Sequence, residues 1–264
     1  MKKAKIRTGI EIEAVLNRGE HPQLKIGEYH NGIKLNKYWK TERDGSLHER
    51  REFNLNLCCE FVSIKLKGKR GFKVAIDNFI KTISKNNLLE LKDVLVFNNS
   101  CGCHLHLGLD DNKAISKLID FRILRDVRKL FFKKITESDI SEEIKDKIKN
   151  HYFRSYAKKL TPLSYIRRRT PRHSEFNIVS ESEGKGLEWR SFNLNGVESW
   201  KDFKTILNIG FDCLYYLYKK RVCGYSLRKE SLRINKSELK QIIEPEPVLL
   251  NIELSDSEVL ECVI

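Results

Sequence analysis

The fold can be worked out from one segment near the start of the chain, Ile6-Arg7-Thr8-Gly9-Ile10-Glu11-Ile12-Glu13-Ala14-Val15. Its side chains alternate in character: the isoleucines, Thr8 and Ala14 fall on one face, and the glycine and the charged residues fall on the other. A repeat of two residues is typical of a β-strand that buries one face and leaves the other open. The segment therefore predicts a half-buried strand whose open face carries Glu11 and Glu13.

Further strands and helices are predicted along the rest of the chain. Strand-like segments lie at 38–41, 54–64, 91–97, 101–109, 176–180 and 186–194. Helical spacing of apolar residues predicts helices at 72–84, 113–135 and 141–157, and another that follows Ser199 and Asp202 and runs to about residue 220. Because strands and helices do not alternate as in a wound parallel sheet, we expect an α+β fold, with an antiparallel sheet and helices packed on one face.

The bulk properties of the chain bound its class. It has 264 residues, with no internal repeat and no low-complexity linker, so we expect a single domain over residues 1–240. No segment approaches the roughly 18 apolar residues of a membrane span, and no apolar run follows the basic start as in a secretory signal. Seven cysteines at irregular spacing indicate reduced thiols rather than a disulfide framework. These features predict a cytoplasmic protein without a membrane partner.

Charge is distributed unevenly along the chain. The formal net charge is +14, and residues 241–264 carry six acids and no Lys or Arg, so the first 240 residues carry +20. A body of this charge attracts polyanions such as nucleotide triphosphates or nucleic acid, although the excess of lysine also serves solubility. Two outcomes are open for the acidic tail, residues 241–264: docking on the basic body, or mobility.

The first candidate for chemistry is the pair of carboxylates in Gly9-Ile10-Glu11-Ile12-Glu13. Two glutamates at positions i and i+2 of a strand project from one face, roughly 7 Å apart. Like charges this close repel unless a cation lies between them, and carboxylate oxygens suit Mg²⁺ or Mn²⁺. The alternative is a solvated outer strand face with two glutamates that bind nothing.

The second candidate is the segment Cys101-Gly102-Cys103-His104-Leu105-His106-Leu107-Gly108. Its two histidines share a strand face, and glycines on that face leave room for a ligand against the sheet. Imidazole either ligates a metal or donates a hydrogen bond to phosphate. Two alternatives stay open: structural histidines, and a zinc-binding interaction module that uses Cys101, Cys103, His104 and His106.

Two more segments carry polar residues on predicted strands. Glu188 and Arg190 share a face in Leu187-Glu188-Trp189-Arg190, which pairs a carboxylate for metal with a guanidinium for phosphate. The alternative is a cross-strand ion pair. Earlier in the chain, Asp44-Gly45 is a turn signal, and Glu60 on the following strand is a further candidate metal ligand.

Taken in order, these four segments resemble the amidoligase family of the glutamine synthetase and glutamate–cysteine ligase superfamily. The family pattern has a Gly-x-Glu-x-Glu strand, an Asp-Gly-Ser turn before a Glu-hydrophobic-Ser strand, a Cys-Gly-x-His-x-His strand and a late Glu-x-Arg strand. The matching segments of this chain are Gly9-Ile10-Glu11-Ile12-Glu13, Asp44-Gly45-Ser46, Glu60-Phe61-Val62-Ser63, Cys101-Gly102-Cys103-His104-Leu105-His106 and Glu188-Trp189-Arg190. The resemblance covers the chain from residue 6 to about residue 220.

The resemblance implies a curved antiparallel sheet of the glutamine-synthetase catalytic type around ATP and two or three Mg²⁺ or Mn²⁺ ions. It implies an enzyme that joins a carboxylate to an amine, of small-molecule or peptide substrates, through an acyl phosphate. Five residues of this chain match metal ligands of the family: Glu11, Glu13, Glu60, His104 and Glu188.

The remaining roles follow from the same resemblance. Catalytic roles fall to Arg190, as a phosphate clamp, and to Glu60. Nucleotide or substrate contacts fall to His106, Arg190, Arg172 and Asn177. The runner-up is a ligase-fold protein without catalysis that binds nucleic acid or has a structural role, motivated by the +20 body and the run Arg167-Arg168-Arg169.

Overall fold

The computed structural model describes residues 6–44, 47, 56–109, 121–151, 176–179, 186–192 and 194–221. All of these residues belong to one compact unit, which spans Met1–Arg228. The acidic tail, residues 241–264, and the domain boundary at residue 240 lie outside the described residues, so both stay predictions. The strands and helices are β1 (Ile6–Asn17), β2 (Ile33–Lys34), β3 (Trp39–Arg43), β4 (Asn56–Ser63), β5 (Leu66–Lys67), α1 (Gly68–Ile83), α2 (Leu91–Val94), β6 (Leu95–Val96), β7 (Cys103–Leu109), α3 (Phe121–Thr136), α4 (Glu142–His151), β8 (Phe176–Val179), β9 (Gly186–Phe192) and α6 (Trp200–Arg221).

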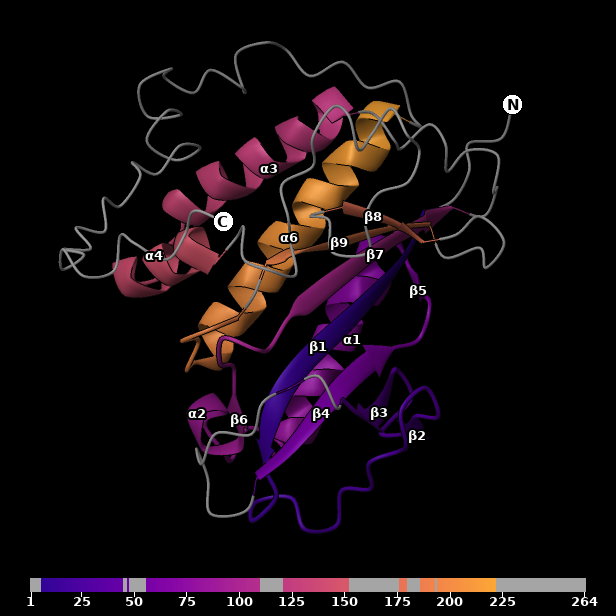
Figure 1. Cartoon of the computed structure of the whole chain (residues 1–264), viewed down its shortest axis with the longest axis vertical. Helices are drawn as coiled ribbons and strands as arrows, with labels where there is room; N and C mark the ends of the chain where they lie inside the picture. The colour runs from indigo at the N-terminus through magenta and orange to yellow at the C-terminus, as the bar shows by residue number, and fades with distance from the viewer. Residues whose placement is uncertain are drawn as a thin grey trace, which may run out of the picture. The chain divides into compact units, whose positions relative to one another are not determined.

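A single sheet is the framework of the described part of the chain. It has nine strands in the order β2-β3-β4-β1-β7-β9-β8, and β5 and β6 also pair with β1. All ladders between these strands are antiparallel, and the sheet is open and curved (Figure 1). The predicted α+β class with an antiparallel sheet is confirmed. The first segment of the chain forms the central strand, because β1 pairs with β4 along one side and with β7 along the other.

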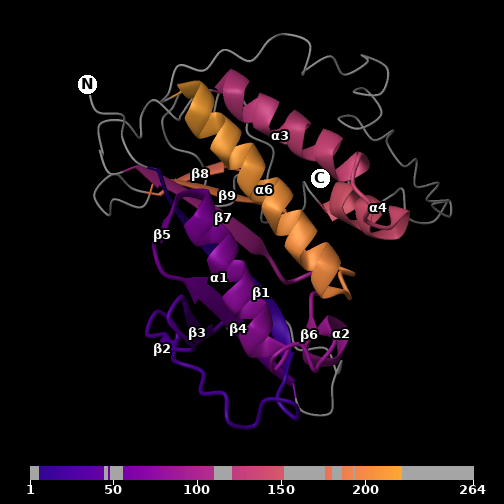
Figure 2. The ribbon, with the colours of Figure 1, turned by 180° about the vertical axis from the view of Figure 1, so that it is seen from behind.

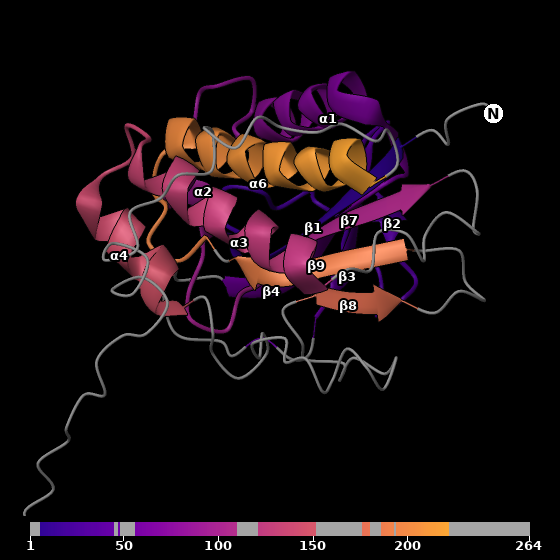
Figure 3. The same cartoon turned by 90° about the horizontal axis from the view of Figure 1, so that it is seen from above.

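The helices cover one face of the sheet, as predicted (Figure 3). Seen from behind, α6 lies between α1 and α3 (Figure 2). Phe61 of β4 is directly opposite Ile12 of β1, and its ring contacts Phe79 of α1 at 5.1 Å between ring centroids. The buried side chains of β1 therefore point into the helix layer, and the glutamates of β1 point away from it. None of the described helices is long and apolar enough to cross a membrane.

Aromatic rings fill the centre of the core between sheet and helices. The ring of Phe79 lies 4.9 Å from Trp39 of β3 and stacks on Phe203 of α6 at 5.6 Å. The indole nitrogen of Trp39 donates a hydrogen bond of 2.8 Å to the carbonyl of Ala75 in α1. These contacts attach α1 and α6 to the strands that carry the open face, and thereby fix the position of that face.

Most predicted elements form, with shifted ends. The cap predicted at Ser199 is present: its hydroxyl accepts a hydrogen bond of 3.0 Å from the backbone N–H of Asp202, in the first turn of α6. Helix α1 begins at Gly68, four residues earlier than predicted, directly after β5. The φ of Gly68 is +60°, a value that glycine adopts readily and that lets the chain turn from strand to helix.

The strand predicted at 91–97 is wrong in its first half. Residues Leu91–Val94 form one helical turn, α2, and only Leu95–Val96 extend to pair with Leu16 and Val15 of β1. Leu91 and Val94 are both buried, and this spacing of three suits a helical turn as well as it suits an apolar strand. A short apolar run therefore did not determine its own conformation.

The aromatic centre generates the first testable prediction. Phe79 is fully buried among rings from two strands and α6, so Phe79→Ala leaves a cavity that the rigid sheet cannot fill. We expect a loss of about 3–5 kcal/mol in the free energy of unfolding, measured by urea denaturation. The control is Leu88→Ala, since Leu88 is 82% exposed and its truncation should change stability by no more than about 0.5 kcal/mol. Equal losses in the two variants would contradict this description of the core.

Candidate functional site

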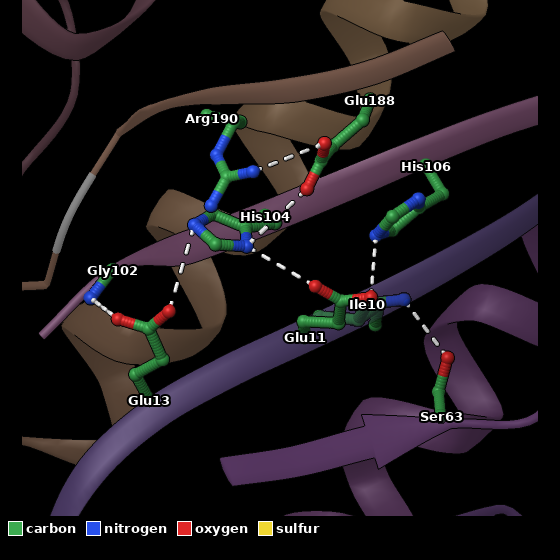
Figure 4. A network of polar contacts seen from close by, with 9 residues as sticks. All are labelled: Ile10, Glu11, Glu13, Ser63, Gly102, His104, His106, Glu188 and Arg190. Carbon is green, nitrogen blue, oxygen red and sulfur yellow. Dashed lines mark hydrogen bonds and ion pairs between the residues drawn. The ribbon is translucent and has the colours of Figure 1, made fainter. Parts of the chain in front are cut away.

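The face of β1 that points away from the helices carries Glu11 and Glu13, as the alternation of the sequence predicts (Figure 4). It is less open than predicted, since the two side chains are 25% and 13% exposed. The antiparallel register places His104 of β7 directly opposite Glu11, and Glu60 of β4 directly opposite Glu13. Directly opposed residues of paired strands project from the same face of a sheet. Three strands that are far apart in the sequence therefore place their polar side chains side by side.

His104 lies at the centre of this group. Its Nδ1 atom is 3.1 Å from Oε2 of Glu11 and 3.5 Å from Oε1 of Glu188, which comes from β9. Its Nε2 atom is 3.8 Å from Oε1 of Glu13. The side chains of His104 and Glu188 are 8% and 6% exposed, so this contact between imidazole and carboxylate is almost free of solvent. One buried imidazole thus lies between three carboxylates.

A second imidazole reaches the same carboxylates. His106 is directly opposite Glu188 in the register, and its Nε2 atom is 2.9 Å from Oε1 of Glu11. Glu11, His106 and Glu188 each offer one ligand atom, and the three atoms lie within 4.8 Å of one another. This spacing suits a shared metal ion. The amidoligase resemblance implies a metal ligand at His104 and a nucleotide contact at His106, but the geometry makes both imidazoles candidate metal ligands.

Gly102 fixes the carboxylate of Glu13. Its backbone N–H donates a hydrogen bond of 2.5 Å to Oε2 of Glu13. A Cβ atom on Gly102 would lie 2.8 Å from Nε2 of His104 and 2.9 Å from Oε2 of Glu13, closer than side-chain atoms tolerate. The expectation that glycine here leaves room for a ligand is therefore corrected, because the side chains of Glu13 and His104 occupy that space.

Glu60 extends the acidic part of the face toward β3. It is opposite Glu13 on one side and opposite Glu42 of β3 on the other. Asp44, which is buried, also acts electrostatically on both Glu13 and Glu60. Glu42 is a site residue that sequence reasoning missed. The sequence signal for Glu42 is weak. Trp39 and Thr41 alternate with Lys40 and Glu42, which places Glu42 on the polar face of β3, but the sequence does not show that Glu42 pairs with Glu60.

Arg190 supplies a positive charge beside Glu188. Its Nη1 atom is 3.4 Å from Oε2 of Glu188, so the predicted sharing of a face is confirmed. Its Nε atom is buried and has no hydrogen-bond partner among the described residues. A guanidinium that is 17% exposed and incompletely paired can accept an anion between itself and the carboxylates.

The protonation of the cluster follows from burial and from its mixed charges. Burial alone would raise the pKa of the Glu11 carboxyl, but His106 and His104 hold that pKa well below its ordinary value. Burial would lower the pKa of the His104 imidazole, but Glu11 and Glu13 raise it. Burial, and then the charges of Glu11 and Glu13, raise the pKa of Glu60 to about 9. Binding of a divalent cation would therefore release protons from His104 and Glu60.

Several predicted site residues are not placed. Asn177 is directly opposite Glu188 in the β8–β9 ladder, which puts its backbone beside the site, but its side chain lies outside the described residues. Arg172 lies outside them as well, together with the run 167–169 and with Gly45 and Ser46 of the predicted turn. Their predicted roles stay predictions.

The alternative zinc site is not assembled. The thiol of Cys103 is fully buried, and β-strand alternation points it away from His104 and His106. Cys101 packs with Val15, Leu47 and Cys58 in a small apolar cluster. The metal-spaced group found among the described residues contains no cysteine.

Comparison of the chain with models of known protein families gives no match, and comparison with curated proteins gives no similar sequence. The interpretation of the site therefore depends on its geometry and on the chemistry of its donor atoms.

The close approach at Gly102 generates the second prediction. In Gly102→Ala, the added methyl group must displace His104 or Glu13, so we expect Mn²⁺ binding, measured by isothermal titration calorimetry, to weaken at least about tenfold. The control is Gly71→Ala in α1, where a Cβ would meet its nearest atom at 3.7 Å and alanine favours the helix by up to about 1 kcal/mol. The control should bind as the wild type does. Wild-type affinity in Gly102→Ala would contradict the described packing of Glu13 against His104.

The pKa of Glu60 generates the third prediction. In the unfolded chain this carboxyl ionises near 4.5, whereas in the folded chain it keeps its proton to about pH 9. Between these values the folded state binds more protons than the unfolded state, so stability falls as pH rises. In EDTA, we expect the Tm of the wild type to decrease from pH 5 to pH 9, and Glu60→Gln to decrease less and to be the more stable protein at pH 9. Parallel Tm profiles of the two proteins would contradict the raised pKa.

Proposed function

We propose that this chain is an ATP- and divalent-metal-dependent ligase that joins a carboxylate to an amine through an acyl phosphate. The observation that carries the proposal is the convergence of Glu11, His104, His106 and Glu188 on one open sheet face, with the guanidinium of Arg190 beside them. These are the donor types, on the predicted strands, that the amidoligase resemblance implies. The central position of β1 in an open, curved antiparallel sheet supports the finer assignment to the glutamine-synthetase type of catalytic sheet.

The donor set fits divalent cations. Carboxylates from β1, β4 and β9 crowd one face, and the raised pKa values of Glu13 and Glu60 reflect the free energy of holding such charges in a buried place. Oxygen ligands suit Mg²⁺ and Mn²⁺, and imidazole shifts the preference toward Mn²⁺ among these two. We propose that Glu11 and Glu188 hold one ion with an imidazole, and that Glu13 and Glu60 hold another.

The proposed chemistry begins with a carboxylate, which is a poor acyl donor because its carbon carries no good leaving group. A carboxylate oxygen attacks the γ-phosphorus of ATP, the bond to the β-phosphate oxygen breaks, and ADP leaves. The acyl carbon then carries phosphate as a good leaving group. Bound divalent ions would supply neutralisation of the charge on the triphosphate and on the approaching carboxylate. The guanidinium of Arg190, whose Nε atom has no hydrogen-bond partner among the described residues, would orient and stabilise the transferring phosphoryl group.

The second half of the reaction needs no nucleophile from the protein. The amine attacks the acyl carbon, the bond from that carbon to the phosphate oxygen breaks, and phosphate leaves with the electron pair. The nitrogen gives up one proton, which completes the amide and inorganic phosphate. Cys103, which lies next to the cluster in the sequence, is unsuited to act as a nucleophile. Burial raises the pKa of its thiol well above its ordinary value, and its side chain faces the helix layer.

The charge of the face bears on the substrate. Two further acids, Glu42 and Asp44, lie around the cluster and favour a cationic or metal-bound substrate group over a free anion.

The test of this function is amine-dependent ATP turnover. Phosphate release from ATP with Mn²⁺ or Mg²⁺ is measured with pooled amino acids, peptides and amines as substrates. We expect turnover by the wild type, and a loss of at least about a hundredfold in Glu188→Gln, which keeps the shape of the side chain but removes its charge. Glu137→Gln is the matched control and should keep full activity, because Glu137 directly follows α3 and its side chain is exposed.

The outcomes separate the proposal from its runner-up. Wild-type turnover in Glu188→Gln would refute the assignment of the site. An absence of turnover, together with salt-sensitive binding of nucleic acid that Glu188→Gln leaves unchanged, would favour the nucleic-acid-binding alternative.

A further inference from the structure

The ladder along one side of β1 is interrupted beside Glu11. The pairing of β1 with β4 ends at Glu11 and Val62, and the pairing of β1 with β5 begins at Thr8 and Leu66. Between these two pairs, β1 advances by three residues, from Glu11 to Thr8, and the opposing segment advances by four, from Val62 to Leu66. The one extra residue opposite β1 makes this a β-bulge. Bulges interrupt the regular backbone hydrogen bonds of a ladder and are frequent next to active sites, where they set the direction of a side chain.

The hydroxyl group of Ser63 takes the place of a missing backbone acceptor at this interruption. It accepts a hydrogen bond of 2.8 Å from the backbone N–H of Ile10 (Figure 4). It also donates one of 3.1 Å to the carbonyl of Ile64. Meanwhile the backbone N–H of Ile64 turns to the other neighbour and donates to the carbonyl of Tyr38. Ile10 is 1% exposed, so its N–H has no access to bulk water as a substitute partner.

Gly9 makes this part of β1 especially dependent on that bond. Glycine within a strand weakens it, since it has no side chain to pack. A Cβ on Gly9 would lie 3.4 Å from Cβ of His106, which is opposite it in the register, and this is an ordinary van der Waals contact. The backbone that precedes Glu11 therefore has no side chain on the site face at Gly9, and neither Gly9 nor Ile10 belongs to the described ladders on the β4 and β5 side.

We propose that Ser63 is a positioning residue for the carboxylate of Glu11. The inference rests on the proposed function, because it takes the cluster around Glu11 to be a cation site. Glu11 makes contacts of 3.1 Å with His104 and 2.9 Å with His106, and a metal ligand must hold its place to within roughly 0.5 Å. The hydroxyl of Ser63 holds the backbone one residue before Glu11, and so holds the carboxylate between the two imidazoles.

A purely structural role for Ser63 makes a different prediction. If the hydroxyl contributed only to stability, its removal would lower the Tm and leave the affinity of the folded protein for a cation unchanged. A positioning role moves that affinity as well. The measurement is therefore the dissociation constant for Mn²⁺, determined by electron paramagnetic resonance on the full chain, with the Tm in EDTA measured in parallel.

Four variants give the test its controls. Ser63→Ala removes the acceptor, and we expect Mn²⁺ to bind about tenfold more weakly than to the wild type. Ser63→Cys keeps a side chain of similar shape with a weaker acceptor and should also lose affinity, which keeps the test decisive if the alanine variant does not fold. Ser63→Thr keeps the hydroxyl and should bind within about twofold of the wild type. Ser138→Ala removes a hydroxyl that bonds to the carbonyl of Ile135, away from the site, and should change nothing.

The failures of the two proposals are distinguishable. Wild-type Mn²⁺ affinity in Ser63→Ala and Ser63→Cys, or an equal loss in Ser63→Thr, would overturn the positioning role while leaving the cation site intact. Absence of Mn²⁺ binding by the wild type would overturn the cation site of the proposed function, and the role of Ser63 with it.

Discussion

Carboxylates of like charge can share a partly buried sheet face only where positive charge or hydrogen-bond donors lie between them. This constraint determines which side chains surround each carboxylate of the site. Glu11 meets two imidazoles, and Glu13 meets an imidazole and the backbone N–H of Gly102. Glu60, beside further acids, keeps its proton to about pH 9 instead. Protons and hydrogen-bond donors thus offset the charge of these carboxylates, which is the role that we propose for bound cations.

The same strand serves the core and the site. On one face of β1, buried aliphatic side chains meet the aromatic layer of α1 and α6, and on the other face the glutamates contact the histidines of β7. A slip of one residue in the register would exchange the two faces, so packing of the core and assembly of the site specify each other. The contact of Phe61 with Phe79 of α1 holds β4 against the helix layer. It thereby helps to position Glu60, the neighbour of Phe61 in β4, and Glu13, which is opposite Glu60 in β1.

Alternation alone predicts the strand β1 and the shared faces of Glu11 with Glu13, and of Glu188 with Arg190, but not the central position of β1 in the sheet. It did not predict partners across strands, because register depends on tertiary packing; Glu42 was missed for this reason, and the shared approach of His104 and His106 to Glu11 was not foreseen. The prediction of a continuous strand at 91–97 is wrong, since the spacing of Leu91 and Val94 is equally compatible with one helical turn. The bulge at Ser63 is invisible in the sequence, as it exists only as a mismatch between two ladders.

The central claim is that side chains from β1, β7 and β9 form a cation site on the open face of the sheet. The most direct measurement is anomalous X-ray diffraction, near the manganese absorption edge, from crystals of the chain grown with Mn²⁺. The account predicts a strong anomalous peak within ligand distance of Glu11, Glu188 and at least one of His104 and His106. No peak there, or occupancy confined to exposed acids such as Glu142 and Glu143 of α4, would contradict it.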